Sequence, residues 1–248
     1  MNTMKYHTNF ILLFLIGILF SSCSRTQLLV STFENDITGI QPNTELPGDP
    51  VGDVIRYDNV IAPRIRVQNS TISGEKALHF TQVPLIPYPP ETRVWLNFRG
   101  ASTSSDKKLR FSWTAQHQNA VDPDEYVLIE LSDGAAKTIA RFYFYADGTI
   151  KRVEDIDSDR KRDLGKVDPT LRHVVFVEVD VRAKTYKLDV ITAATNSNIS
   201  RDALPFNYSD FTVNSTNPIN PTLSFRLDNG GNDRRKYIIE GVEISQEN

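Results

Sequence analysis

The chain has 248 residues, and 28 lysine and arginine residues stand against 31 aspartate and glutamate residues, which gives a formal net charge of −3 at pH 7. Without a basic excess to attract phosphates, we expect no nucleic-acid partner. The single cysteine excludes an internal disulfide, and the length suits one all-β domain or two small ones. No linker composition divides the chain, so we expect one.

An apolar run near the amino terminus predicts a secretory signal. Residues 11–20 read ILLFLIGILF, follow a polar segment with one positive charge, Lys5, and are closed by Ser21 and Ser22. A membrane-spanning helix needs about 20 apolar residues, so this shorter run is typical of a cleaved signal peptide. We expect the signal peptide to cover residues 1–22.

The only cysteine, Cys23, comes directly after this signal. Phe20-Ser21-Ser22-Cys23 resembles the lipobox of bacterial lipoproteins, with Phe20 where that family more often has leucine. The resemblance implies a diacylglycerol on the Cys23 thiol, cleavage just before it and acylation of the new amino terminus. Lipidation would also remove a free thiol, which is a liability in an oxidising compartment. The alternative is an ordinary secretory signal whose cysteine merely lies near the cleavage site.

The amino-terminal pattern therefore predicts where the protein is found. We expect an outer membrane lipoprotein of the bacterial cell envelope, held by the lipid on Cys23, with the face of the membrane left open. Residues 23–28 are expected to be a lipidated tether, and residues 29–248 the folded domain.

The rest of the chain is a series of short runs in which apolar residues recur at every second position, the period of a β-strand. Residues 34–53, with three prolines and three glycines, predict a long loop over the surface. Strands are expected at 28–33, 76–83, 92–98, 107–115, 125–131, 137–146, 148–153, 172–181, 185–191, 222–228 and 236–244.

No window of the mature chain has the period of a helix of ten or more residues, so the fold class is all-β, with an antiparallel two-sheet sandwich or jelly roll as its architecture. The order of GEKALHF (74–80), FYFYADGTIKRV (142–153), RHVVFVEVDVRAKTYKLDV (172–190) and YIIEGVEIS (237–245) resembles concanavalin A-like (laminin G-like) jelly rolls of bacterial surface proteins. Such domains more often close with an Ile-Asp-Asp-Val-type strand. The resemblance implies the fold and, in many relatives, a glycan-facing surface, but it transfers no site residue.

Strand alternation indicates one candidate ligand surface. It places Arg93, Trp95 and Asn97 on one face of their strand, and it turns three residues of the RFYFYA run outward, namely Arg141, Tyr143 and Tyr145. Aromatic rings beside arginine and asparagine suit a sugar, because the ring packs on the C–H face while the polar groups bind hydroxyls. The alternative is that these aromatic residues form a second small core beneath a loop. Trp113 is expected in the main core.

Catalytic and metal patterns are incomplete. Glu178 and Asp180 share the outward face of their strand about 7 Å apart, which suits a hydrolase, yet no third acid follows them as in laminarinase-like relatives, and we expect them to be solvated. Gln116-His117-Gln118 is the one candidate lyase cluster, and its accompanying motifs are missing. We expect His7, His79, His117 and His173 at surface or loop positions.

The run from Asp155 to Asp159 has the first three acids of a calcium loop, but Arg160 and Lys166 stand where glycine and glutamate belong. A self-neutralising hairpin loop is the preferred interpretation. We therefore expect no catalytic residue, no metal site and no cofactor.

Together these features predict an envelope-anchored lipoprotein whose mature part is a non-catalytic binding module for carbohydrate rather than an enzyme. Two alternatives stay open: a polysaccharide-degrading glycoside hydrolase or lyase, and a structural or assembly partner of other envelope proteins. The enzyme requires a groove with convergent acids, the binding module a groove with aromatic and polar side chains, and the scaffold an apolar patch.

Overall fold

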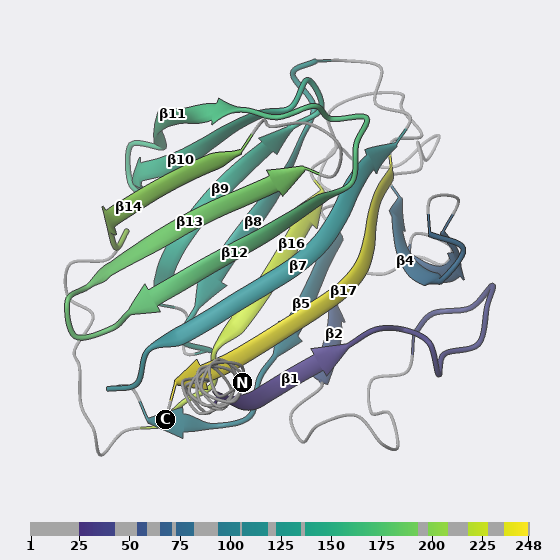
Figure 1. The fold of residues 1–248 in the computed structure, drawn as a ribbon, viewed down its shortest axis with the longest axis horizontal. Helices are drawn as coiled ribbons and strands as arrows, with labels where there is room; N and C mark the ends of the chain where they lie inside the picture. The colour runs from purple at the N-terminus through teal and green to yellow at the C-terminus, as the bar shows by residue number, and fades with distance from the viewer. Residues whose placement is uncertain are drawn as a thin grey trace, which may run out of the picture.

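The protein is a two-layered β-sandwich, as the computed structural model in Figure 1 shows. The structure describes residues 25–42, 54–58, 65–70, 73–81, 94–104, 106–118, 123–134, 137–192, 198–207, 218–227 and 236–247. Every regular element in these residues is a strand, and every strand pairing is antiparallel. The predicted all-β class and sandwich architecture are confirmed.

The eight-stranded sheet forms one layer, in the order β14-β13-β12-β7-β17-β4-β3, with β1 pairing to β17. In Figure 1 the long strands β7 and β17 cross the middle of this layer and curve along their length. Its strands are β1 (Arg25–Ser31), β3 (Ile65–Asn69), β4 (Lys76–Thr81), β7 (Leu109–Gln118), β12 (His173–Asp180), β13 (Thr185–Thr192), β14 (Ile199–Pro205) and β17 (Lys236–Glu247).

The seven-stranded sheet forms the other layer, in the order β11-β10-β9-β8-β16-β5-β2. Its strands are β2 (Val54–Asp58), β5 (Val94–Arg99), β8 (Tyr126–Ser132), β9 (Thr138–Tyr145), β10 (Thr149–Asp155), β11 (Arg160–Lys166) and β16 (Thr222–Leu227). A short pair, β6 (Thr103–Ser104) and β15 (Pro218–Ile219), forms a two-stranded ladder of its own.

The core lies between the two sheets and is built by alternation along their strands. On β7 every second residue from Leu109 is buried, while the residues between are half-exposed. Trp113 is only 1% exposed, as predicted, and it packs edge-on against Phe225 of the opposite sheet with ring centroids 5.9 Å apart. Such edge-to-face contacts join the two layers. The residues that alternate with the buried ones point away from the core and form the outer surface of each sheet.

Glycine fixes the turn between β9 and β10 that the Ala-Asp-Gly sequence predicts. Gly148 has a φ of +87°, and a Cβ there would lie 1.9 Å from the carbonyl oxygen of Val167. Only glycine fits this position without moving the backbone.

The predicted strands correspond to observed ones with shifts of a few residues at their ends. Sequence reasoning missed β2, β3 and β14, the short pair β6 and β15, and also β11, whose residues it assigned to a loop. The first strand begins at Arg25, so residues 25–28 of the predicted tether lie within β1. Of the expected loop at 34–53, the structure describes 34–42, where the Gly39 amide donates to the Val67 carbonyl at 2.8 Å.

The expectation that the histidines lie at the surface is wrong for three of them. His79, His117 and His173 are on strands and are 5%, 7% and 1% exposed. His117 and His173 both contact Tyr237 between the sheets, at 4.9 Å between ring centroids for His117 and at 3.1 Å from His173 Nε2 to the Tyr237 hydroxyl. The tyrosine gives these rings a partner inside the core, which the spacing of histidines alone did not show. His7 lies outside the described residues.

His173 should make the fold sensitive to acid. Burial lowers the pKa of His173 from its ordinary value of 6.5 to about 4, so between these values the unfolded chain binds a proton that the folded chain does not. Stability is therefore fully present above pH 6.5 and falls as the pH drops towards 4. Urea unfolding of the protein and of His173→Gln across this range should show a steeper loss for the wild type. Parallel curves would contradict this role.

Candidate functional site

The outer face of the eight-stranded sheet carries polar side chains along its central strands. On β7, the alternation turns Arg110, Ser112 and Thr114 outward. On β12 it turns Phe176 and Glu178 outward, and the register sets Arg110 opposite Glu178 and Ser112 opposite Phe176. Because paired strands are about 4.8 Å apart, these side chains form one continuous surface.

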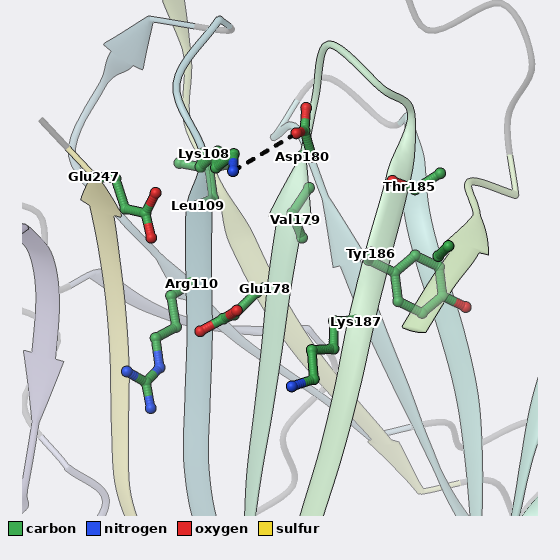
Figure 2. Close-up of a pocket in the computed structure, with 11 residues that line it drawn as sticks. Lys108, Leu109, Arg110, Glu178, Val179, Asp180, Thr185, Tyr186, Lys187 and Glu247 are labelled. Atoms are coloured by element: carbon green, nitrogen blue, oxygen red, sulfur yellow. Dashed lines mark ion pairs between the residues drawn. The ribbon is translucent and has the colours of Figure 1, made fainter. Parts of the chain in front are cut away.

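A first pocket of about 230 Å³ opens at one end of this face. Figure 2 shows that its charged side chains project from neighbouring strands, with Arg110, Glu178 and Lys187 in a row across β7, β12 and β13. The charged residues that line it are Lys108, Arg110, Glu178, Asp180, Lys187 and Glu247.

Ion pairs hold the acids of this pocket. Lys108 Nζ lies 3.9 Å from Asp180 Oδ2, the pair that is dashed in Figure 2. Arg25 Nη2 lies 3.8 Å from both Glu178 Oε1 and Glu247 Oε1. Such half-exposed pairs add about 1 kcal/mol or less to stability each. The pairs matter mainly for the pocket itself, because each of these three acids has a cation beside it.

A second pocket of about 190 Å³ opens further along the same face, towards the carboxyl end of β7. Ser112 and Thr114 of β7, Val174 of β12 and Glu243 of β17 are among its lining residues. A bulge in β17 brings Gly241 to this pocket, and a Cβ there would meet only the Ser31 carbonyl oxygen, at 3.6 Å. The absent side chain leaves the pocket open.

A stacked pair lies between the pockets. Arg110 Cζ lies 4.2 Å from the centroid of the Phe176 ring, within the range of a cation–π contact. Phe176 continues into an apolar patch, because the neighbouring outward residue Val174 pairs with Ile191 of β13, which is 42% exposed. We call the two pockets, the Arg110–Phe176 pair and this patch the β7 groove.

The size and chemistry of the β7 groove indicate an elongated ligand. Each pocket is smaller than the 300–1,000 Å³ typical of sites that enclose a small molecule. An extended polymer lying along the sheet can use both. Apolar surface beside hydroxyl, carboxylate and guanidinium groups matches a sugar, whose C–H face is apolar and whose edge carries hydroxyls.

Glu178 and Asp180 point outward as predicted, and both line the first pocket. Their side chains are 48% and 36% exposed and lie beside Arg25 and Lys108. A general acid in a glycosidase instead needs an apolar, buried setting that keeps its carboxyl group protonated. This arrangement favours binding over hydrolysis.

Three predicted ligand residues lie on the outer face of the seven-stranded sheet, on β9. Tyr143 is only 5% exposed, and its hydroxyl donates to Asp159 Oδ1 at 3.0 Å. Burial, and then this hydrogen bond, raise the pKa of Tyr143 well above its ordinary value. Tyr145 packs beside it with Lys151 Nζ 4.8 Å from the ring centroid, and Arg141 is ion-paired to Glu130 at 2.5 Å.

These tyrosines form a second small core, which was the alternative to a binding surface. Tyr143 is buried with Leu128 and Val153, while Tyr126, Tyr145 and Ile156 pack against them. The hairpin of β10 and β11 supplies Val153 and Ile156, and the neighbouring strand β8 supplies Leu128 and Tyr126. The ring of Tyr143 is therefore occupied by protein contacts.

Of the remaining predicted ligand residues, Trp95 and Asn97 belong to β5. Asn97 lies on the outer face opposite Ser224, and Trp95 has a described backbone opposite Arg226. The side chain of Trp95 and all of Arg93 lie outside the described residues. Two strands, β8 and β16, separate β5 from β9, so the two groups are about 14 Å apart at matched register. A ligand-binding role for this face stays a prediction.

The acidic run at 155–159 forms the tip of the β10–β11 hairpin. The Asp155 carboxylate accepts bonds from the Asp157 amide at 3.1 Å and the Ser158 hydroxyl at 2.7 Å, and the Ser158 bond is the main cause of its lowered pKa. Asp159 pairs with Lys161 at 2.9 Å. The run therefore lies in a hairpin, as the preferred interpretation has it, and one of its acids is paired with a cation of the same hairpin. Within the ranges that the structure describes, no three histidine, cysteine, aspartate or glutamate side chains are grouped to hold a metal ion.

Sequence reasoning missed Arg110, Ser112, Thr114 and Phe176 as site residues. The signal was present, because LRFSWTAQHQ alternates strictly and its polar positions must face away from the core. What the alternation did not contain was the order of the strands. The adjacency of β7 with β12 and β17 creates the groove, and these strands are far apart in the sequence.

Cys23 and the predicted signal peptide lie outside the described residues. In the part of the chain that is described, no helix has the length and apolar character needed to cross a membrane.

The sequence matches no protein-family model and no curated protein. Similar solved structures include a carbohydrate esterase from the Shiga toxin-encoding bacteriophage phi24B, with a TM-score of 0.57, 11% identity, and coverage of 91% of this chain and 100% of that one. The winged bean acidic lectin complexed with methyl-α-D-galactose has a TM-score of 0.55, 8% identity, and coverage of 90% and 99%. Lectin I from Ulex europaeus, in complex with a methyl glycoside of α-L-fucose, has a TM-score of 0.54, 8% identity, and coverage of 90% and 97%. At these identities the likeness shows the fold alone, a β-sandwich of the kind that these lectins have.

Proposed function

We propose that this protein is a carbohydrate-binding module and that its ligand lies along the β7 groove. The observation that carries the proposal is the composition of the groove, in which the Arg110–Phe176 pair stands between two open pockets. The lectin-like fold supports it, because two of the similar structures are complexes with sugar glycosides.

A binding role accounts for the groove better than catalysis. The similar phage structure is a carbohydrate esterase, which keeps an enzyme as the alternative. An esterase or glycosidase needs a nucleophile or an acid held by a partner that activates it. The acids of the first pocket are instead half-exposed and ion-paired. The other alternative, a structural or assembly partner of envelope proteins, would require a surface that is mainly apolar. This face is largely polar.

We further propose that the module is attached to the bacterial outer membrane through a lipid on Cys23. The supports are the apolar run, the small pair before the cysteine and the absence of any other cysteine. The first strand begins at Arg25, two residues after Cys23, and Arg25 contacts two acids of the first pocket. A lipid on Cys23 would therefore bring this end of the groove close to the membrane surface.

Phe176→Ala should abolish or strongly weaken glycan binding. The substitution removes apolar surface from the groove, and it also removes the ring on which the Arg110 guanidinium stacks. Loss of a stacked aromatic contact is expected to weaken binding by about tenfold or more. The protein and the variant would be compared on an array of bacterial and plant polysaccharides. Trp95→Ala is the matched control on the other sheet and should leave binding unchanged. A wild-type protein that binds no glycan, or binding that depends on Trp95 alone, would contradict the proposal.

A further inference from the structure

Arg110 differs from the other cations of the β7 groove because it has no charged partner among the residues that the structure describes. Lys108 and Arg25 contact acids of the first pocket, and Lys187 Nζ lies 3.1 Å from Asp189 Oδ2. The Arg110 guanidinium contacts the ring of Phe176, and within the described residues it has no ion pair or hydrogen bond. Its Nε atom is buried without a partner.

An unpaired, partly buried guanidinium is costly unless a ligand completes it. The Phe176 ring removes part of its motional freedom and leaves the N–H groups at the edge of the guanidinium plane. These N–H groups form a fork that matches the two oxygens of a carboxylate. Figure 2 shows the guanidinium directed along β7, away from the carboxylate of Glu178. The fork therefore faces the part of the groove that lies between the two pockets.

We infer that the β7 groove selects glycans that carry carboxylate groups, as uronic acids do, and that Arg110 binds the carboxylate. The inference rests on the proposed function and names its ligand class. The hydroxyls of Ser112 and Thr114 lie next along β7 and line the second pocket. They are suited to the neutral hydroxyls of the same chain of sugars, so one polymer can satisfy both kinds of group.

Glu243 provides an internal check on this inference. It faces the second pocket from β17, opposite Ser112, and it makes no ion pair with the residues that the structure describes. A uronate bound at Arg110 would lie near this negative charge. Arg110 and Glu243 should therefore influence an acidic ligand in opposite directions, although both border the same groove.

The test compares polygalacturonate, polyglucuronate and polymannuronate with their carboxyl-reduced counterparts, which keep linkage and length but lack the charge. We expect the intact protein to bind at least one polyuronate about tenfold more tightly than its reduced form, the effect of one charge-assisted contact. Arg110→Gln should remove that preference, because it weakens binding of the polyuronate about tenfold more than it weakens binding of the reduced polymer. Glu243→Gln should strengthen binding of the polyuronate severalfold.

The outcomes separate this inference from the proposed function. Equal binding of each polyuronate and its reduced form, with loss of both in Phe176→Ala, would overturn the carboxylate preference and leave the carbohydrate-binding role intact. A preference that survives in Arg110→Gln, or a Glu243→Gln variant that weakens polyuronate binding, would also overturn it. If the protein binds neither these polymers nor any neutral glycan, the proposed function and the inference fall together.

Discussion

Replacing Arg172 with alanine should lower the free energy of unfolding by about 3 kcal/mol, because it leaves a buried carboxylate without its cation. The partner is Glu240, whose side chain is 4% exposed and whose Oε2 lies 2.6 Å from Arg172 Nε. Ser70 and Ser73 donate hydroxyl hydrogen bonds to Glu240 Oε1 at 2.8 Å and 3.1 Å. This cluster joins the bulge of β17 to the turn after β3 and the turn before β12.

Urea unfolding gives the measurement, with the slope of the transition checked for two-state behaviour. The matched control is the double variant Arg172→Ala with Glu240→Gln, whose neutral amide oxygen still accepts the serine bonds. It should regain more than half of the lost stability. A loss below about 1 kcal/mol in the single variant is the value of a solvated surface pair. That result would show that the cluster contributes little to the stability of the fold.

Cys23→Ala should move the protein from the membrane fraction to the soluble fraction. Each buried acyl CH₂ contributes about 0.8 kcal/mol, and two or more chains are needed for stable attachment. The loss of the lipid site should therefore release nearly all of the protein. Fractionation followed by mass measurement of the mature amino terminus checks both the attachment and the modification.

The control for this experiment is Ser24→Ala, which leaves the cysteine and the apolar run unchanged and should stay in the membrane fraction. Membrane retention of Cys23→Ala, or an unmodified cysteine in the wild-type protein, would contradict the lipoprotein proposal. Because Arg25 already belongs to β1, little chain separates the lipid from the sandwich. The folded domain would be held close to the bilayer.

Sequence patterns carried most of the information about the sandwich, because alternation is local. The faces of Trp113, Tyr143 and Glu178 were each assigned correctly from the period of two. Strand β11 was missed because RKRDLGK has almost no apolar alternation, and the structure shows four consecutive exposed residues at the edge of its sheet. An edge strand can be polar, since only one of its sides is paired and its charges discourage further pairing.

The candidate site was far less predictable than the fold. Tyr143 does turn outward, yet the hairpin that covers it depends on the pairing of β10 with β11 and on the contact of Asp159 with its hydroxyl. Phe176 drew no attention within VVFVEVDV, because a phenylalanine among valines is typical of a core strand. Its value as a site residue depends on Arg110, which is 66 positions away in the sequence and adjacent only through the register of β7 with β12.

The most direct test of the central claim is to map where a bound glycan touches the protein. Backbone amide chemical shifts would be recorded during titration with a glycan that the array identifies. If the glycan lies in the β7 groove, the largest changes should fall at 110–114 on β7 and 174–178 on β12, on the outer face of the eight-stranded sheet. Changes concentrated at 95–99 and 141–145 would place the ligand on the opposite sheet and contradict the β7 groove as the binding site.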